Sequence, residues 1–277
     1  MLGEYKANIA PIQMPSAAAL RRQIENDFQH RYPSVLSPRV RTAREVVATG
    51  IAQIDDLLDG GFPIGAISEI TGSASSGRTT LALAFLARLT QDGMACAWID
   101  ANDNLDPESA AANGVLLNHL LWVRCSNAPS KLPSSTIRPA PSINKQPWTR
   151  FDRAIRATDL LIQAGGFAAI VLDLADEAIE HGRRIPLATW FRFRQTADRT
   201  RCSLIVLGKA AYAQSSAALV LDCKPDRIDI AMGSVIRSFQ FTAQRRRMRS
   251  ESLTNIARKP PVSTWSTHAP WNIERQA

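Results

Sequence analysis

The chain contains 277 residues, of which 45% are hydrophobic and 21% charged, and its formal net charge is +8. This length fits one large domain with extensions or two small domains, and the hydrophobic fraction provides for a sizeable core. No run of 18 apolar residues occurs, and Met1 to Pro15 has no apolar signal segment, so we expect a cytoplasmic protein without membrane contact. The cysteines are widely spaced and mostly lie in apolar runs, which predicts reduced core thiols without a metal site: Cys96, Cys125, Cys202 and Cys223.

The basic charge is concentrated at the two ends of the chain. Residues 1–49 contain seven basic and four acidic residues, and residues 237–277 contain eight basic and two acidic residues, which leaves a net charge of −1 for the middle. Ends of this kind are expected to meet an acidic partner or nucleic acid, whereas the middle is not.

Residues 1–48 are predicted to form a helix followed by an extended linker. Ser16 is suited to cap the helix, and Leu20, Ile24 and Phe28 form an apolar stripe at helical spacing. Two prolines then favour an extended passage to about residue 47. The stripe must be buried somewhere, so the helix either folds back on its own domain or docks on another protein.

Residues 66–89 contain the strongest local signal. A short apolar run at 66–71 predicts a buried strand, and apolar residues at helical spacing predict a helix over 79–89. The loop between them matches the phosphate-binding pattern G-x-x-x-x-G-K-[ST] except that Arg78 replaces the lysine. Such a loop aims backbone N–H groups at a phosphate, although a glycine-rich turn without a ligand is the alternative. The predicted nucleotide-binding residues are Gly72, Ser73, Ala74, Ser75, Ser76, Gly77, Arg78, Thr79 and Thr80.

Strands and helices alternate through residues 49–245, which predicts an α/β core with a mostly parallel sheet covered by helices. Asp106 and Pro107 are typical of a helix start. Five prolines in residues 126–147 predict an exposed, mobile loop. The apolar run 167–173 ends in Asp173, as in a Walker B strand whose aspartate holds Mg²⁺ through water; a plain strand before a polar loop is the alternative.

The last part of the chain is predicted to hold late strands, near 229–232 and 238–242, and then a basic, disordered tail over residues 246–277. Its first residues are candidates for binding a partner or DNA: Arg245, Arg246, Arg247 and Arg249.

These motifs resemble the RecA-like recombinase family over about residues 17–243. The likeness includes QIENDF at 23–28, the stretch TGIAQIDDLLDGGFPIGAISEITGSASSGRTTLALA at 49–84, and DANDNLDPESAAANGVLLNHLLWV at 100–123. Within that family, SSGRT, LIQAGGFAAIVLDLAD and RIPLATWFRFRQ are similar to the ImuA-type accessory proteins of damage-induced mutagenesis. The resemblance implies a RecA-like P-loop core and a site related to those that bind ATP and Mg²⁺.

Several positions depart from the pattern of a working recombinase. Asn102 stands where a glutamate activates the attacking water, and Ser109 stands where an aromatic ring stacks on adenine. Gly208 and Lys209 replace a glutamine that senses the γ-phosphate. The segments that form DNA-binding loops in a recombinase are short here, at 181–186 and 209–216.

Loss of a general base typically slows a reaction by ~10²–10⁴-fold, so we expect weak nucleotide binding and negligible turnover, unless Asp103 substitutes for the missing base. What the resemblance implies is a scaffold in the SOS response that aids translesion synthesis, with a Y-family-like polymerase partner (ImuB-like) and the RecA recombinase as partners. The alternatives are a slow P-loop ATPase acting on DNA, and a basic DNA-binding module that works through its tail.

Overall fold

The computed structural model describes residues 16–31, 44–125, 149–231, 235–248 and 261–268, and the chain forms two units, residues 1–42 and 43–277. The expected proline-rich loop at 126–147 and Arg249 lie outside the described residues.

The first unit contains the predicted helix, α1 (Ala17–Arg31). The Ala19 N–H donates to the Ser16 hydroxyl at 3.3 Å, as expected for an N-cap. Leu20 and Ile24, two members of the predicted stripe, are 47% and 50% exposed, while the side chain of Phe28 lies outside those described. Whether the helix docks on a partner stays a prediction.

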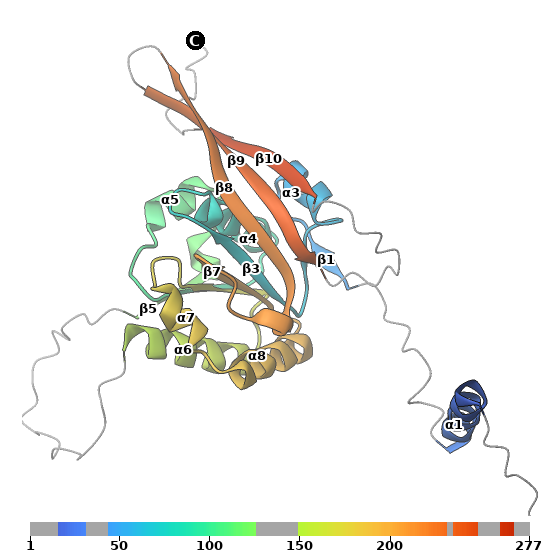
Figure 1. Ribbon diagram of the computed structural model, residues 1–277. Coiled ribbons are helices and arrows are strands. Elements are labelled where there is room, and N and C mark those ends of the chain that lie inside the picture. Colours follow the sequence, from blue (N-terminus) through green and yellow to red (C-terminus); the bar gives the residue numbers. More distant parts are fainter. Residues whose placement is uncertain (1–15, 32–43, 126–148, 232–234, 249–260, 269–277) are drawn as a thin grey trace, which may run out of the picture. The chain divides into compact units, whose positions relative to one another are not determined.

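The second unit is built on a sheet of eight strands in the order β10-β9-β8-β3-β7-β6-β4-β5 (Figure 1). The ladders from β5 to β8 are parallel, and β9 and β10 are added antiparallel at the β8 side. This confirms the predicted α/β class with a mostly parallel sheet. The strands are β3 (Ile67–Gly72), β4 (Cys96–Asp100), β5 (Leu120–Arg124), β6 (Ala169–Asp173), β7 (Ser203–Gly208), β8 (Ala217–Ala231), β9 (Val235–Met248) and β10 (Val262–His268). A separate two-stranded sheet pairs β1 (Val46–Val47) with β2 (Phe62–Pro63).

Helices cover both faces of this sheet. Side chains alternate between the faces along each strand, so on β6 Val171 belongs to one apolar cluster while Ile170 and Leu172 belong to the other. The first cluster includes α3 (Ala52–Leu57), α4 (Arg78–Gln91) and α5 (Pro107–Ala112), and the second includes α6 (Arg150–Ala164) and α8 (Leu187–Thr200). Short helices complete the unit: α7 (Ile179–Arg183) and two 3-10 turns at Leu117–His119 and Gln214–Ser216.

Two helix starts are fixed by local capping. Asp106 accepts hydrogen bonds from the N–H groups of Glu108 and Ser109, with proline at the first helical position, as the sequence predicted for α5. Thr149 and Asp152 form a reciprocal capping box at the start of α6.

The sheet continues past residue 245, which differs from the expected disordered tail. β9 extends to Met248, and β10 pairs with β9 along its whole length. Trp265 of β10 is only 2% exposed, and its ring lies 4.6 Å from that of Phe241 between centroids. The disordered-tail prediction is therefore wrong for residues 246–248 and 262–268, because a buried tryptophan holds this part of the chain on the sheet.

The four cysteines are free and buried, in agreement with the prediction of reduced core thiols. In the part of the chain that the structure describes, no helix combines the length and the apolar character needed to cross a membrane.

Candidate functional site

The predicted phosphate-binding loop connects β3 to α4. Gly72 and Gly77 both have positive φ angles, +155° and +84°, and Ser75 adopts +56°. A Cβ atom on Gly72 would lie 2.3 Å from the carbonyl oxygen of Cys223 on β8, so only glycine fits there. The loop therefore has the backbone geometry that the sequence pattern predicts.

The N–H groups of this loop lie at the positive end of α4. The first N–H groups of a helix have no partner within the helix. Residues 73–75 and Thr79 are exposed there, whereas residues 76–78 are buried. A helix start of this kind suits a phosphate, and a threonine hydroxyl in this position is of the type that binds Mg²⁺.

Arg78 does not face the loop in the manner of a phosphate-binding lysine. Its side chain is buried, with the residue 6% exposed, and Nη1 donates to the carbonyl oxygen of Gly208 at 2.7 Å. Burial lowers the pKa of Arg78, while the charge of Asp173 acts in the opposite direction. The long guanidinium group thus extends past the loop to the end of β7 and stays within the field of the Walker B-like carboxylate.

Asp173 lies at the carboxyl end of β6, as the sequence predicted. Its Oδ1 accepts a hydrogen bond from the Ala175 N–H at 2.9 Å, and the residue is 5% exposed. Burial raises its pKa to about 6; the neighbouring Asp100 adds to this increase, and Arg78 opposes it. A carboxyl group with a raised pKa that already interacts with the charge of Arg78 is a poorer Mg²⁺ site than an ordinary Walker B aspartate.

The loop after β4 holds no free general base. The amide Nδ2 of Asn102 is buried without a hydrogen-bond partner among the described residues. Asp103 forms a two-pronged ion pair with Arg124, and Asp100 accepts hydrogen bonds from the Asn102 and Asp103 N–H groups. Asp103 is therefore engaged with an arginine, which weighs against its role as a substitute base.

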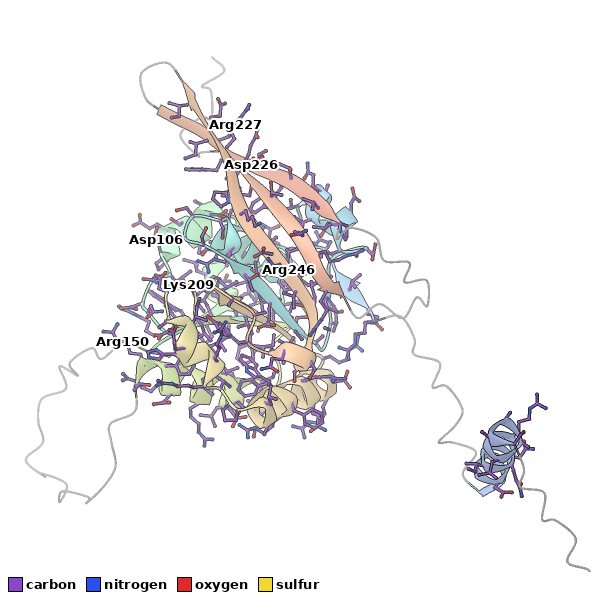
Figure 2. All side chains as sticks on the ribbon, viewed as in Figure 1. Asp106, Arg150, Lys209, Asp226, Arg227 and Arg246 are labelled. Atoms are coloured by element: carbon purple, nitrogen blue, oxygen red, sulfur yellow. The ribbon has the colours of Figure 1, made fainter. Side chains whose placement is uncertain are left out.

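The remaining departures from the expected pattern are at Ser109 and at Gly208 with Lys209. The Ser109 hydroxyl donates to the Asp106 carboxylate, and Ser109 offers no ring on which a base could stack. Lys209, which follows Gly208, donates from Nζ to the carbonyl oxygen of Asp176 at 3.1 Å (Figure 2). Of the described residues, those that the resemblance places at these positions do not supply base stacking, water activation or γ-phosphate sensing: Ser109, Asn102 and Lys209.

The arginines predicted as a binding tail lie instead on β9. Arg245 pairs with Asp59, and Arg246 pairs with Asp222. Arg246 is labelled in Figure 2. Nη1 of Arg247 donates to the carbonyl oxygen of Gln214. These side chains hold the edge of the sheet to neighbouring elements, so the expectation of a free basic tail is wrong for these three residues.

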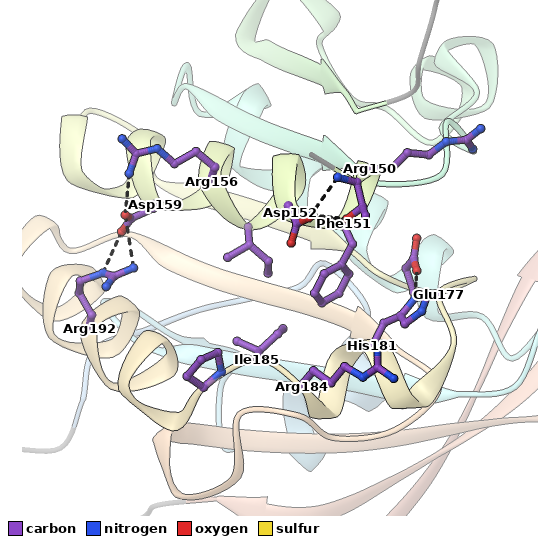
Figure 3. A pocket seen from close by; sticks show the side chains of 13 residues that line it. Arg150, Phe151, Asp152, Arg156, Asp159, Glu177, His181, Arg184, Ile185 and Arg192 are labelled. Carbon is purple, nitrogen blue, oxygen red and sulfur yellow. Dashed lines mark hydrogen bonds and ion pairs between the residues drawn. The ribbon is translucent and has the colours of Figure 1, made fainter. Parts of the chain in front are cut away.

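A cavity that sequence reasoning missed lies between α6, α7 and the start of α8 (Figure 3). Its volume is about 830 Å³, and its walls combine apolar side chains such as Phe151 and Ile185 with arginines. On one side Asp159 is held between Arg156, at 3.6 Å, and Arg192, at 3.1 Å. No local sequence pattern predicts this cavity, because its walls come from three helices that meet only in the fold.

Comparison with known proteins finds similarity to RecA. Residues 16–132 match the RecA N-terminal domain. The chain is 39% identical over 110 residues to Protein RecA of Crocosphaera subtropica, which is 40% of this chain and 32% of that protein. It is 34% identical over 157 residues to Protein RecA of Rickettsia canadensis, which is 56% of this chain and 39% of that protein. The matches thus span only about a third to two fifths of these relatives.

The fold is also similar to that of the RadB recombinase crystal structure. The TM-score is 0.53 at 16% sequence identity, and the similarity covers 79% of this chain and 94% of that one. A segment similar to the RecA N-terminal domain therefore lies within a fold similar to that of a recombinase crystal structure.

Proposed function

We propose that the chain is a RecA-like accessory protein of the DNA-damage (SOS) response that supports error-prone translesion synthesis through protein partners. Its ATP site is degenerate and does not drive strand exchange. The observation that carries this proposal is the placement of Arg78, whose buried guanidinium bonds to Gly208. A retained fold combined with redirected catalytic groups is expected of a scaffold rather than of a motor.

The nucleotide half of the proposal follows from the same geometry. The N–H groups of the loop would hold the phosphates of ATP, and Thr79 and Asp173 would hold Mg²⁺, each weakly. Asn102 cannot accept a proton from the attacking water, and Asp103 is paired with Arg124. Binding without appreciable turnover follows, which also weighs against a slow ATPase acting on DNA.

The partners in this proposal are a Y-family-like polymerase of the ImuB type and the RecA recombinase. The exposed stripe of α1 supports it, because Leu20 and Ile24 present apolar surface that a partner protein would cover. The alternative of a basic DNA-binding module is less well supported, since Arg245 and Arg246 already have acidic partners within the fold.

A genetic experiment tests the cellular role. In cells that lack this chain, we expect damage-induced mutation to fall to the spontaneous level, while recombination of a marked chromosomal locus continues at the normal rate. Thr79→Ala on a plasmid should restore induced mutation if the site has no catalytic duty, because Thr79 is exposed. The proposal fails if deletion abolishes recombination, or if induced mutation is unchanged.

A binding experiment tests the partners. The purified full chain should co-elute with the polymerase or with RecA in gel filtration, and Leu20→Asp with Ile24→Asp should abolish the complex. Gln23→Asp, on the same helix, is the matched control and should retain it. Unimpaired binding by the Leu20→Asp, Ile24→Asp variant would assign the partner surface elsewhere.

A further inference from the structure

Two loops leave the carboxyl edge of the sheet next to the phosphate cradle. The first, residues 174–186, follows β6 and contains α7, and the second, residues 209–216, follows β7. Tyr212 of the second loop is 3% exposed although it lies in an irregular segment. A buried aromatic ring in a loop next to a ligand site needs a specific place to be packed.

Two glycines create that place. A Cβ atom on Gly182 of α7 would lie 2.4 Å from Cε1 of Tyr212, and a Cβ atom on Gly208 would lie 2.6 Å from its Cε2. The two edges of the phenol ring are therefore flanked by the two glycines, one from each loop region. Neither glycine has a positive φ angle, so backbone conformation does not require glycine at either position. The ring alone crowds position 182, whereas a Cβ atom at position 208 would also lie 2.9 Å from the Ala210 carbonyl oxygen.

Side chains from the strand and the helix that flank the cradle loop bind these two loop regions. Glu69 of β3 is 1% exposed, and its Oε1 accepts hydrogen bonds from the N–H groups of Tyr212, at 2.5 Å, and Ala213, at 2.9 Å. Arg78 of α4 holds the Gly208 carbonyl oxygen. The strand before the loop and the helix after it thus each contribute one buried charged group to the two loops.

We infer that Tyr212, wedged between Gly182 and Gly208 and tethered by Glu69 and Arg78, is a built-in lock that holds both loops in one conformation whatever occupies the phosphate cradle. A side chain at position 208 would collide with the ring, so a polar residue able to sense a phosphate cannot coexist with Tyr212 there. Arg78 fixes the end of β7 through its hydrogen bond to the Gly208 carbonyl oxygen. The lock is independent of the cellular role proposed above.

A double-mutant cycle read by hydrogen exchange tests the lock. In the full chain we expect slow exchange of the amides at 179–185 and 210–216 without any nucleotide. Gly182→Ala forces the ring out and should accelerate exchange of both segments by about tenfold or more. In a Tyr212→Ala background the same Gly182→Ala change should add nothing, because the ring is gone. Tyr212→Phe retains the ring and should retain slow exchange.

Two results would overturn this inference. The first is equal acceleration by Gly182→Ala in the presence and in the absence of the ring, which would mean that position 182 acts only on its own helix. The second is a change of more than about twofold in exchange of either loop when MgATP is added to the wild-type chain. If MgATP alters only the amides of residues 73–80, or none, the lock stands.

Discussion

The guanidinium group of Arg78 donates a 2.7 Å hydrogen bond to the carbonyl oxygen of Gly208, across the gap between the start of α4 and the end of β7. Arg78 stands at the lysine position of the phosphate-binding pattern, and Gly208 stands where the resemblance leads us to expect a phosphate-sensing residue. The contact therefore joins two positions that depart from the expected pattern. The contact is buried, so breaking it leaves a carbonyl oxygen without a partner in a site of low polarity.

Replacing Arg78 with a shorter cation should therefore destabilise the fold. Arg78→Lys is expected to lower the free energy of unfolding by about 1–3 kcal/mol, because lysine lacks the planar fork that reaches Gly208. Urea denaturation measures this. Arg88→Lys on the same helix, whose pair with Asp92 is half exposed, is the matched control and should change stability by less than about 0.5 kcal/mol. Equal effects of the two changes would refute the tether.

The buried carboxylate of Asp173 predicts a pH dependence. Burial raises its pKa from 3.8 in the unfolded chain to about 6, so the folded state binds more protons between these values. The contribution of Asp173 to stability is then present below pH 3.8 and is lost as the pH rises through about 6. Relative to Asp173→Asn, the wild-type chain should therefore lose about 1–3 kcal/mol of unfolding free energy as the pH rises over this range.

Chemical denaturation at a series of pH values measures that difference. Asp92→Asn, at an exposed position, serves as the control and should leave the pH dependence of the unfolding free energy unchanged. If the free energy of unfolding changes equally with pH in Asp173→Asn and in the wild type from pH 4 to pH 7, the carboxyl group of Asp173 is exposed to solvent.

Trp265 should be essential to the core although it lies far along the chain. Trp265→Ala removes a ring that contacts Phe241 and covers Gly77, and we expect it to lower the free energy of unfolding by about 3–5 kcal/mol. Val262→Ala, at a residue 49% exposed on the same strand, should cost less than about 1 kcal/mol. Similar melting temperatures for the wild type and Trp265→Ala would mean that β10 contributes little.

The helix α1 should act in association and not in the stability of the second unit. Leu20→Asp with Ile24→Asp is expected to leave the main melting transition within about 1 °C, because both side chains are half exposed. Any self-association seen by light scattering should be lost in the same variant. A large drop in the melting temperature would instead show that α1 packs on its own domain.

Local signals were enough to predict much of the fold. The β3–loop–α4 unit, the helix start at Asp106 and the strand that ends at Asp173 each depend on residues close together in sequence. Their hydrophobic periodicity and capping chemistry are therefore visible without a structure. The α/β class followed from the alternation of such units.

Non-local relationships could not be predicted in this way. Trp265 was an isolated apolar residue in a polar stretch, and only its pairing partner β9 makes β10 a strand. The sequence shows that arginine replaces lysine at position 78. The orientation of the Arg78 side chain, however, depends on a carbonyl group 130 residues away. The ring of Tyr212 packs between Gly182 and Gly208. The sequence alone does not show that a ring occupies the space where a side chain at these glycines would lie.

ATP turnover by the purified full chain, measured with and without single-stranded DNA, tests the degenerate site most directly. We expect turnover at the background of the assay, no stimulation by DNA, and a rise only when Arg78→Lys and Asn102→Glu are combined in a folded variant. DNA-stimulated hydrolysis by the wild-type chain, abolished by Thr79→Ala, would contradict it.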